Sequence, residues 1–233
     1  MVLTDDNFAS IVAAVEEGRG IFGNIKKYLM YLLSANAGEV LLVMAAVVLG
    51  YPLPLIAIQI LYVNLATDGL PALALAVDPP EPDLMRRPPR PPRQSIFTRP
   101  VLRFLGVAGV WTGLVTLGVF IWALETGRPL VEAQGLTFVT LILIELFNAF
   151  NSRSPEQSLF KVGLFSNRWL LLAIAWELTL MSVIVYTPFL QGPFHTFSLG
   201  LRDWGVVLLA SASILGVVEL MKFLGLRLGW RRG

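Results

Sequence analysis

The chain has 233 residues, 55% of them hydrophobic and 15% charged, with a mean hydropathy of +0.69 and a formal net charge of +2. This composition is too apolar for an ordinary soluble domain, and it excludes a disordered or collagen-like chain. The sequence contains no cysteine, which excludes disulfides, thiolate metal ligands and a cysteine nucleophile.

Six stretches of the sequence are apolar and long enough to cross a membrane as helices. A hydrocarbon core of about 30 Å requires about 20 residues at a rise of about 1.5 Å per residue. Runs of this kind, bounded by charges or prolines, cover residues 28–50, 55–77, 101–124, 135–150, 169–190 and 204–226. The sequence therefore predicts an all-α, polytopic membrane protein in which six transmembrane helices form a bundle.

The lysines and arginines are distributed unevenly between alternate connections of the predicted spans. Of the 18 basic residues, only Arg128 and Arg202 fall on one side of the membrane, and all the others fall on the side of the termini. Because cytoplasmic loops carry the excess of basic residues, we expect both termini in the cytoplasm. Arginines so placed suit lipid headgroups rather than nucleic acid. The expected partner is the lipid bilayer, and the expected location is a bacterial plasma membrane.

Three cytoplasmic segments flank or connect the spans. Residues 1–27 include apolar positions at helical spacing, which predict a helical stalk leading into the first span. Gly18, Gly20 and Gly23 weaken the continuity of that helix. The loop of residues 78–100 is rich in proline and arginine, which favours a stiff extended conformation and a docking surface for a cytoplasmic partner. A basic tail, residues 227–233, follows the six-helix region of residues 28–226.

Several polar side chains lie inside the predicted spans, where a carboxylate costs about 2.5 to 3.5 kcal/mol. Glu39, Asp68 and Glu145 lie about 15 to 18 Å from an end of their spans, near the bilayer midplane. Each has an amide three or four residues away on the same helical face. Carboxylate and amide oxygens held where water is scarce can replace the hydration shell of a hard cation. These candidate cation-binding residues are Asn36 with Glu39, Asn64 with Thr67 and Asp68, and Glu145 with Asn148.

Hydrogen bonds between helices are the alternative explanation of these polar residues. Three carboxylates at matched depth, each beside an amide, favour cation binding instead. Glu177 in the fifth predicted span stays open as a further cation ligand, a proton carrier or the partner of an amide. Glu219 and Lys222 lie one helical turn apart and predict a local ion pair.

Pro71 predicts an interruption in the second span. Proline has no amide hydrogen, so backbone carbonyls near Thr67 are expected to leave the helical ladder. Such backbone is tolerated at membrane depth only where it lines a cavity or is buried in protein. Gly38 and Gly69 are expected to let helices approach closely around this cavity. With no cysteine and one histidine, His195, in an outer loop, the sequence disfavours metals that need soft ligands.

Four long segments, taken in order, carry a resemblance to a known family. They are DDNFASIVAAVEEGRGIFGNIKKYLMYLLSANAGEV from Asp5 to Val40, VNLATDGLPA from Val63 to Ala72, DPPEPDLMRRPPR from Asp78 to Arg90, and IELFNAFNSRSPEQSL from Ile144 to Leu159. Together they resemble the C-terminal membrane half of P-type cation-transporting ATPases, most closely the sarco/endoplasmic reticulum-type calcium pumps. The resemblance covers essentially the whole chain and implies that its spans are helices five to ten of a ten-helix domain.

The resemblance also implies which residues bind the transported ion. Asn64 in NLATDG is similar to the calcium subgroup, whereas sodium/potassium pumps have aspartate at that position. Glu177 resembles a ninth-helix glutamate of sodium/potassium pumps and matches no ligand of the animal calcium pumps. Arg86 replaces an acidic residue that is usual in the loop. The departure at Glu177 leaves open whether the ion is calcium, manganese or sodium, and whether protons are returned. The positions that match calcium ligands are Asn36, Glu39, Asn64, Thr67, Asp68 and Glu145.

The family's phosphorylation motif DKTGT and fourth-helix motif PEGLP do not occur in this sequence. No Gly-Lys pair supplies a Walker-type phosphate loop either. We therefore expect no ATP hydrolysis by this chain alone. ATP and magnesium are expected to act only through the missing N-terminal half of the pump, which holds the first four helices and the phosphorylation, nucleotide-binding and actuator domains. The predicted function is binding and translocation of a cation, calcium first, by a truncated product or split subunit. The alternative is a stand-alone six-helix protein that binds cations passively or regulates a pump.

Overall fold

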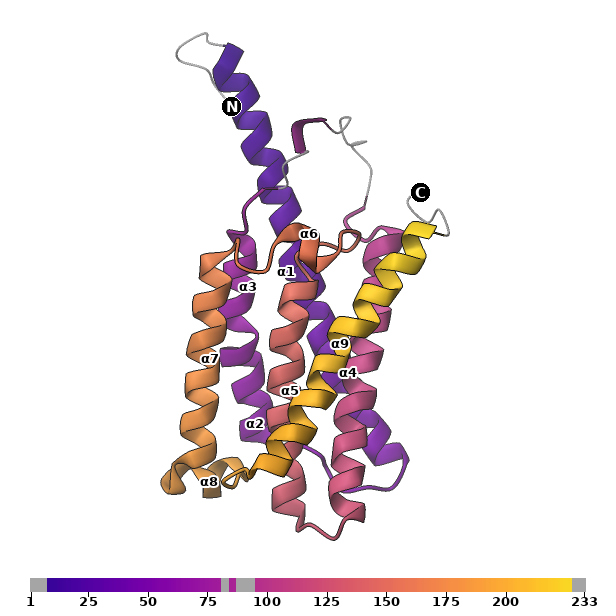
Figure 1. Ribbon diagram of the computed structural model, residues 1–233, viewed down its shortest axis with the longest axis vertical. Coiled ribbons are helices and arrows are strands. Elements are labelled where there is room, and N and C mark those ends of the chain that lie inside the picture. Colours follow the sequence, from indigo (N-terminus) through magenta and orange to yellow (C-terminus); the bar gives the residue numbers. More distant parts are fainter. Residues whose placement is uncertain (1–7, 81–83, 87–94, 228–233) are drawn as a thin grey trace.

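The computed structural model describes residues 8–80, 84–86 and 95–227. This part of the chain contains six helical segments that are long and apolar enough to cross a membrane. They form a bundle (Figure 1), so the predicted all-α membrane architecture is confirmed. The segments are α1 (Phe8–Val48), the interrupted helix α2 (Ala57–Tyr62), η1 (Val63–Thr67) and α3 (Gly69–Ala76), then α4 (Arg99–Glu125), α5 (Leu130–Asn151), α7 (Arg168–Tyr186) and α9 (Leu201–Arg227).

The first helix combines the predicted stalk and the first span. It runs without a break for 41 residues, so Gly18, Gly20 and Gly23 do not interrupt it. Its first turns project beyond the bundle, as Figure 1 shows, and the described part of the predicted stalk, from Phe8 onwards, is helical. Residues 1–7 of the stalk and 228–233 of the tail lie outside the described part of the chain.

The second span is interrupted where Pro71 predicts it. Residues Val63–Thr67 form a π-helical turn, in which the amide of Asp68 donates to the carbonyl of Val63 at 2.9 Å, five residues earlier. Pro71 lies in the first turn of α3 and has no amide hydrogen to offer to the carbonyl of Thr67, four residues earlier. The segment NLAT therefore lies in a wider helical turn than the regular α-helix from which the spacing of Asn64, Thr67 and Asp68 was interpreted.

Two of the predicted boundaries are wrong because prolines start new helices. The fourth span begins at Leu130 rather than residue 135, directly after Pro129 at the helix N-cap. The fifth span ends at Tyr186 rather than residue 190, because Thr187 is extended before Pro188, which begins the short helix α8 (Pro188–Phe194). A four-residue helix, α6 (Leu159–Val162), lies between α5 and α7.

Most of the predicted proline- and arginine-rich loop lies outside the described residues, which omit 81–83 and 87–94. The described piece Leu84–Arg86 is a 3-10 turn, η2, rather than an extended strand of chain. Its Leu84 carbonyl accepts a hydrogen bond from Arg19 Nη1 at 3.0 Å. The loop therefore contacts the stalk portion of α1.

Close packing between α1 and α4 depends on small residues. A Cβ atom added at Gly38 would lie 2.7 Å from Thr112 Cγ2, and one at Gly109 would lie 2.9 Å from the Cβ of Ala37. The predicted role of Gly38 is thus confirmed, although its neighbour is α4. The same prediction for Gly69 is wrong, because a Cβ there would meet nothing within 4 Å. The most deeply buried span is α5, which lies in the centre of the bundle (Figure 1).

The first turns of α1 and the last turns of α9 lie at the same end of the bundle (Figure 1), as the predicted orientation requires. Arg128, in the α4–α5 turn, and Arg202, in the first turn of α9, lie at the opposite end. An odd number of spans would have placed the termini at opposite ends of the bundle. The six spans that the sequence predicts, an even number, therefore agree with the fold.

Candidate cation site

Four buried carboxylates come from four different helical segments. Glu39 lies on α1, Asp68 between η1 and α3, Glu145 on α5 and Glu177 on α7, with exposures of 7%, 2%, 0% and 0%. Glu145 is within electrostatic range of the other three. Because these groups are separated by up to 138 positions in sequence, only the packing of α5 between its neighbours brings them into one region.

Many oxygens in this region are buried and lack a hydrogen-bond partner. Buried polar atoms in folded proteins are normally paired, since an unpaired one costs about 1 to 3 kcal/mol. Here most of the unpaired side-chain atoms among the described residues are carboxylate oxygens, which are ligands that hard cations prefer. Among the described side chains, the unpaired carboxylate oxygens are Glu39 Oε1, both oxygens of Asp68, both of Glu145, and Glu177 Oε2.

The carboxylates share a region without converging on one point. Among the described residues, no three aspartate, glutamate, histidine or cysteine side chains lie close enough together to hold one metal ion. A complete coordination shell in this region therefore requires amide, hydroxyl or backbone oxygens as well as the carboxylates.

The predicted amides and hydroxyl are placed differently from one another. Asn64 Nδ2 donates to Glu39 Oε2 at 2.8 Å and so joins the interrupted span to α1. Thr67 Oγ1 donates to Glu177 Oε1 at 2.7 Å and joins the same span to α7. The amide of Asn36 is exposed and donates to the Leu32 carbonyl of its own helix at 2.8 Å. Asn36 and Asn64 thus stand at the exposed edge of the cluster, where Asn64 contacts Glu39, whereas Thr67 is buried within it.

Asn148 contacts α1 rather than the other amides. Its Nδ2 donates to Ser34 Oγ at 2.9 Å, and its Oδ1 is buried without a partner. Glu177 accepts a hydrogen bond from the hydroxyl of Thr67. Its partner is therefore a hydroxyl, where one of the predicted alternatives was an amide. The predicted local pair of Glu219 and Lys222 is confirmed at 3.4 Å.

Sequence reasoning missed two tyrosines in this region. Tyr31 is fully buried, and its hydroxyl donates to the backbone carbonyl of Thr67 at 3.0 Å. This is the carbonyl that Pro71 leaves without an amide donor, so the tyrosine replaces the missing backbone hydrogen bond. The hydroxyl of Tyr62 is buried without a hydrogen-bond partner and interacts electrostatically with Glu177. The spacing of Tyr31, Ser34 and Gly38 at i, i+3 and i+7, which places them on one face of a helix, was the available signal.

Replacing Tyr31 by phenylalanine is expected to destabilise the fold by about 1 to 3 kcal/mol, because the Thr67 carbonyl becomes a buried acceptor without a donor. Pro71→Ala restores a backbone amide at the position that would normally serve this carbonyl. In the Pro71→Ala background, Tyr31→Phe should therefore cost about 1 kcal/mol less. Unfolding in detergent of the wild type, both single variants and the double variant measures this coupling. A coupling of zero would mean that the tyrosine does not replace the backbone donor.

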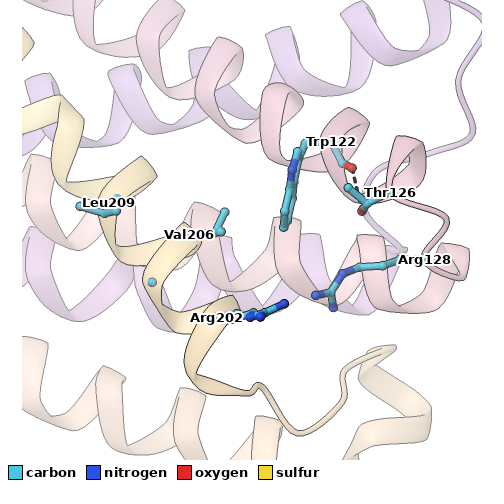
Figure 2. Close-up of a pocket in the computed structure, with 7 residues that line it drawn as sticks. Trp122, Thr126, Arg128, Arg202, Val206 and Leu209 are labelled. Carbon is cyan, nitrogen blue, oxygen red and sulfur yellow. Dashed lines mark hydrogen bonds between the residues drawn. The ribbon is translucent and has the colours of Figure 1, made fainter.

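A separate cavity of about 520 Å³ lies between α4 and α9 at the end of the bundle away from the termini. Figure 2 shows Arg128 and Arg202 directed toward one another across it, beside Trp122. Two guanidinium groups make this cavity unsuited to a cation. It contains none of the predicted site residues, and its lining is Trp122, Thr126, Arg128, Arg202, Gly205, Val206 and Leu209.

Comparison with known proteins gives a family match and several relatives. Residues 52–224 match the family model described as "Cation transporting ATPase, C-terminus". The chain is 44% identical over 213 residues to a "Calcium-transporting ATPase" of Bacillus subtilis, covering 91% of this chain and 24% of the relative. It is 43% identical to "Calcium-transporting ATPase 1" of Bacillus cereus, covering 95% of this chain and 27% of the relative. It is 35% identical to "Calcium-transporting ATPase 4, endoplasmic reticulum-type" of Arabidopsis thaliana, covering 97% of this chain and 26% of the relative. The chain thus spans about a quarter of the length of these relatives.

Proposed function

Because this chain belongs to the family of cation-transporting ATPase C-terminal domains and is a C-terminal membrane domain of a P-type calcium ATPase, we propose that it binds Ca²⁺ midway across the membrane and passes it through. It is an integral, multi-pass membrane domain for cation transport.

The observation that carries the proposal is the group of unpaired carboxylate oxygens on four helical segments. Desolvating several carboxylates without a counter-charge is costly, and polar groups at membrane depth mark ion pathways. In the proposed site, Glu39, Asp68 and Glu145 supply the charge that offsets the lost hydration of Ca²⁺. Asn64 and Thr67 supply neutral oxygens, Asn36 completes the edge, and Glu177 is an additional ion or proton site beside Thr67.

One side of the proposed site has exposed polar side chains, which supports a partner that covers them. Asn36 and Asn64 are exposed at the depth of buried Glu39, although an exposed amide in hydrocarbon is unfavourable. We propose that helices of the N-terminal half cover this side and complete the site. In the assembled pump, the phosphorylation, nucleotide-binding and actuator domains of that half would use ATP and magnesium, and residues 1–27 and 78–100 would face them at the cytoplasmic side of a bacterial plasma membrane.

The direct test is equilibrium binding of radioactive Ca²⁺ to the purified chain in lipid nanodiscs, with Mn²⁺ and Na⁺ as competitors. We expect saturable binding of Ca²⁺, and we expect Asp68→Asn to weaken its affinity by about 10- to 100-fold. Removing an outer-shell partner of a metal ligand has an effect of that size, and removing a ligand should have at least the same effect. The matched control is Glu219→Gln, because Glu219 is already paired with Lys222 and with the amide of Leu159. That control should bind Ca²⁺ as the wild type does.

Transport is tested by joining the chain to the part of the Bacillus subtilis relative that precedes the matched region. ATP-driven Ca²⁺ uptake into vesicles is the expected result, and Asp68→Asn should abolish it. Absence of saturable binding in nanodiscs, or equal affinity in the wild type and Asp68→Asn, would overturn the site assignment. Preferential displacement by Na⁺ or Mn²⁺ would overturn the choice of ion alone.

A further inference from the structure

Four helical segments meet at one buried carboxylate, Asp78, at the end of the bundle that carries the termini. The Asp78 side chain is 1% exposed and lies directly after α3. Lys27 Nζ on α1 lies 2.6 Å from its Oδ2, and Arg153 Nε after α5 lies 3.0 Å from its Oδ1. Asn167 Nδ2 at the start of α7 donates to Oδ1 at 2.7 Å. These residues, Lys27, Asp78, Arg153 and Asn167, are called the Asp78 cluster below.

Further hydrogen bonds fix two members of the Asp78 cluster, Arg153 and Asn167, to the chain around them. Arg153 donates from Nη1 to the carbonyl of Gly163 at 2.6 Å and from Nη2 to Ser166 Oγ at 2.7 Å. Asn167 Nδ2 also donates to the Ala74 carbonyl at 2.9 Å, and its Oδ1 caps α7 by accepting from the Leu170 amide. Among the described buried side-chain atoms that lack a partner, none belongs to this cluster. The Asp78 cluster is therefore fully paired, in contrast to the cation site.

Each member of the Asp78 cluster lies on, or directly beside, a segment that carries one carboxylate of the cation site. Lys27 shares α1 with Glu39, and Asp78 ends the segment that holds Asp68. Arg153 follows the helix of Glu145, and Asn167 caps the helix of Glu177. At about 1.5 Å per residue, the cluster lies about 12 to 18 Å along the helix from each carboxylate. A helix is stiff over that length, so a shift at one end moves the other.

We propose that the Asp78 cluster is a clamp that sets the axial register of these four segments and thereby the geometry of the cation site. Its members are positioning residues, since they act on the ion through Glu39, Asp68, Glu145 and Glu177. Sliding α1, α5 or the segment of Asp78 separates a buried charge from its counter-charge, which is far less favourable than breaking an exposed pair. Sliding α7 breaks the hydrogen bond from Asn167 to Asp78. The inference rests on the proposed function, because it gives the cluster a role in cation affinity.

The absence of cysteine allows the register to be measured directly. Spin labels on introduced cysteines, Val40→Cys beside Glu39 and Trp176→Cys beside Glu177, report the distance between α1 and α7 by pulsed electron resonance. Both positions are more than half exposed, so the labels face lipid. Asp78→Asn keeps the shape but removes the charge shared by Lys27 and Arg153. We expect a broadened or shifted distance distribution and Ca²⁺ affinity at least ten-fold lower.

The matched control is Asp203→Asn, which removes a carboxylate paired with Arg128 at the opposite end of the bundle. It should leave both the distance distribution and the Ca²⁺ affinity within two-fold of the wild type. If Asp78→Asn does not fold, Arg153→Lys provides the test, because lysine keeps the charge but cannot reproduce the three-way hydrogen bonding. That variant should also broaden the distribution and weaken Ca²⁺ binding.

The two readouts separate the clamp from the proposed function. A folded Asp78→Asn or Arg153→Lys variant with the wild-type distance distribution overturns the clamp, even where the wild type binds Ca²⁺. A wild type that binds no Ca²⁺ overturns the proposed function and the clamp's role in affinity. In that case a broadened distribution in the variants would still support the role of the cluster in helix register.

Discussion

Replacing Glu145 by glutamine is expected to weaken Ca²⁺ binding by more than about 100-fold, beyond the ~10- to 100-fold typical for outer-shell partners of a metal ligand. Glu145 is fully buried on α5, both of its carboxylate oxygens are unpaired, and it interacts with all three other carboxylates. Glutamine occupies the same volume, so packing is retained. The substitution removes one negative charge and places an amide nitrogen, a donor, where the ion needs an acceptor.

The same substitution should stabilise the ion-free fold, because it removes a buried carboxyl group whose ionisation in a dry region beside three other carboxyl groups is unfavourable. Ca²⁺ should raise the unfolding temperature of the wild type, since an ion that binds only the folded state stabilises it by mass action. In Glu145→Gln this rise should disappear. Thermal unfolding in detergent, with Ca²⁺ and with a chelator, measures both effects. The control on the same helix is Glu132→Gln, whose partner is Arg128, and it should keep the Ca²⁺-dependent rise. Loss of the rise in both variants would contradict a specific site at Glu145.

Replacing Gly109 by leucine is expected to destabilise the bundle by about 3 kcal/mol or more, the upper range for overpacking a well-packed core. A Cβ at this position would lie 2.9 Å from the Cβ of Ala37 and 3.2 Å from the carbonyl oxygen of Ser34. Both neighbours belong to α1, and neither is the end of a flexible side chain that can move aside. The helices would have to separate, and Gly38, which precedes Glu39 in α1, lies at that contact. Ca²⁺ binding should therefore fall together with stability.

The matched control is Gly106→Leu on the same helix, because a Cβ there meets nothing within 4 Å and the position is exposed. Leucine has a higher helix propensity than glycine, so this control should be neutral or stabilising by up to about 1 kcal/mol. Denaturation in detergent, followed by circular dichroism, compares the two variants. Equal stability of Gly106→Leu and Gly109→Leu would show that the close α1–α4 contact does not hold the bundle together.

Local chemistry explains which features could be predicted from the sequence. A span is recognised from about 20 consecutive apolar residues, and the interruption of the second span from Pro71 alone, because proline lacks an amide hydrogen wherever it stands. The start near Pro129 was placed too late because Glu132 and Gln134 interrupt the apolar run that follows this proline. The end near Pro188 was placed too late because apolar residues continue past that proline, although it starts a new helix. Glu39, Asp68 and Glu145 were recognisable as candidates because a carboxylate in a span is unusual by itself.

The tertiary structure alone decided which of these groups meet. Thr67 and Glu177 are 110 positions apart, and their hydrogen bond depends on how α7 is rotated against the interrupted span. The same holds for the contact of Gly38 with α4, for the open surroundings of Gly69, and for the convergence on Asp78. By itself, the sequence determined an all-helical membrane domain with carboxylates at mid-depth, since hydrophobicity and charge act over one helix. Helix order and rotation, which set the contacts between helices, depend on the packing of all six together.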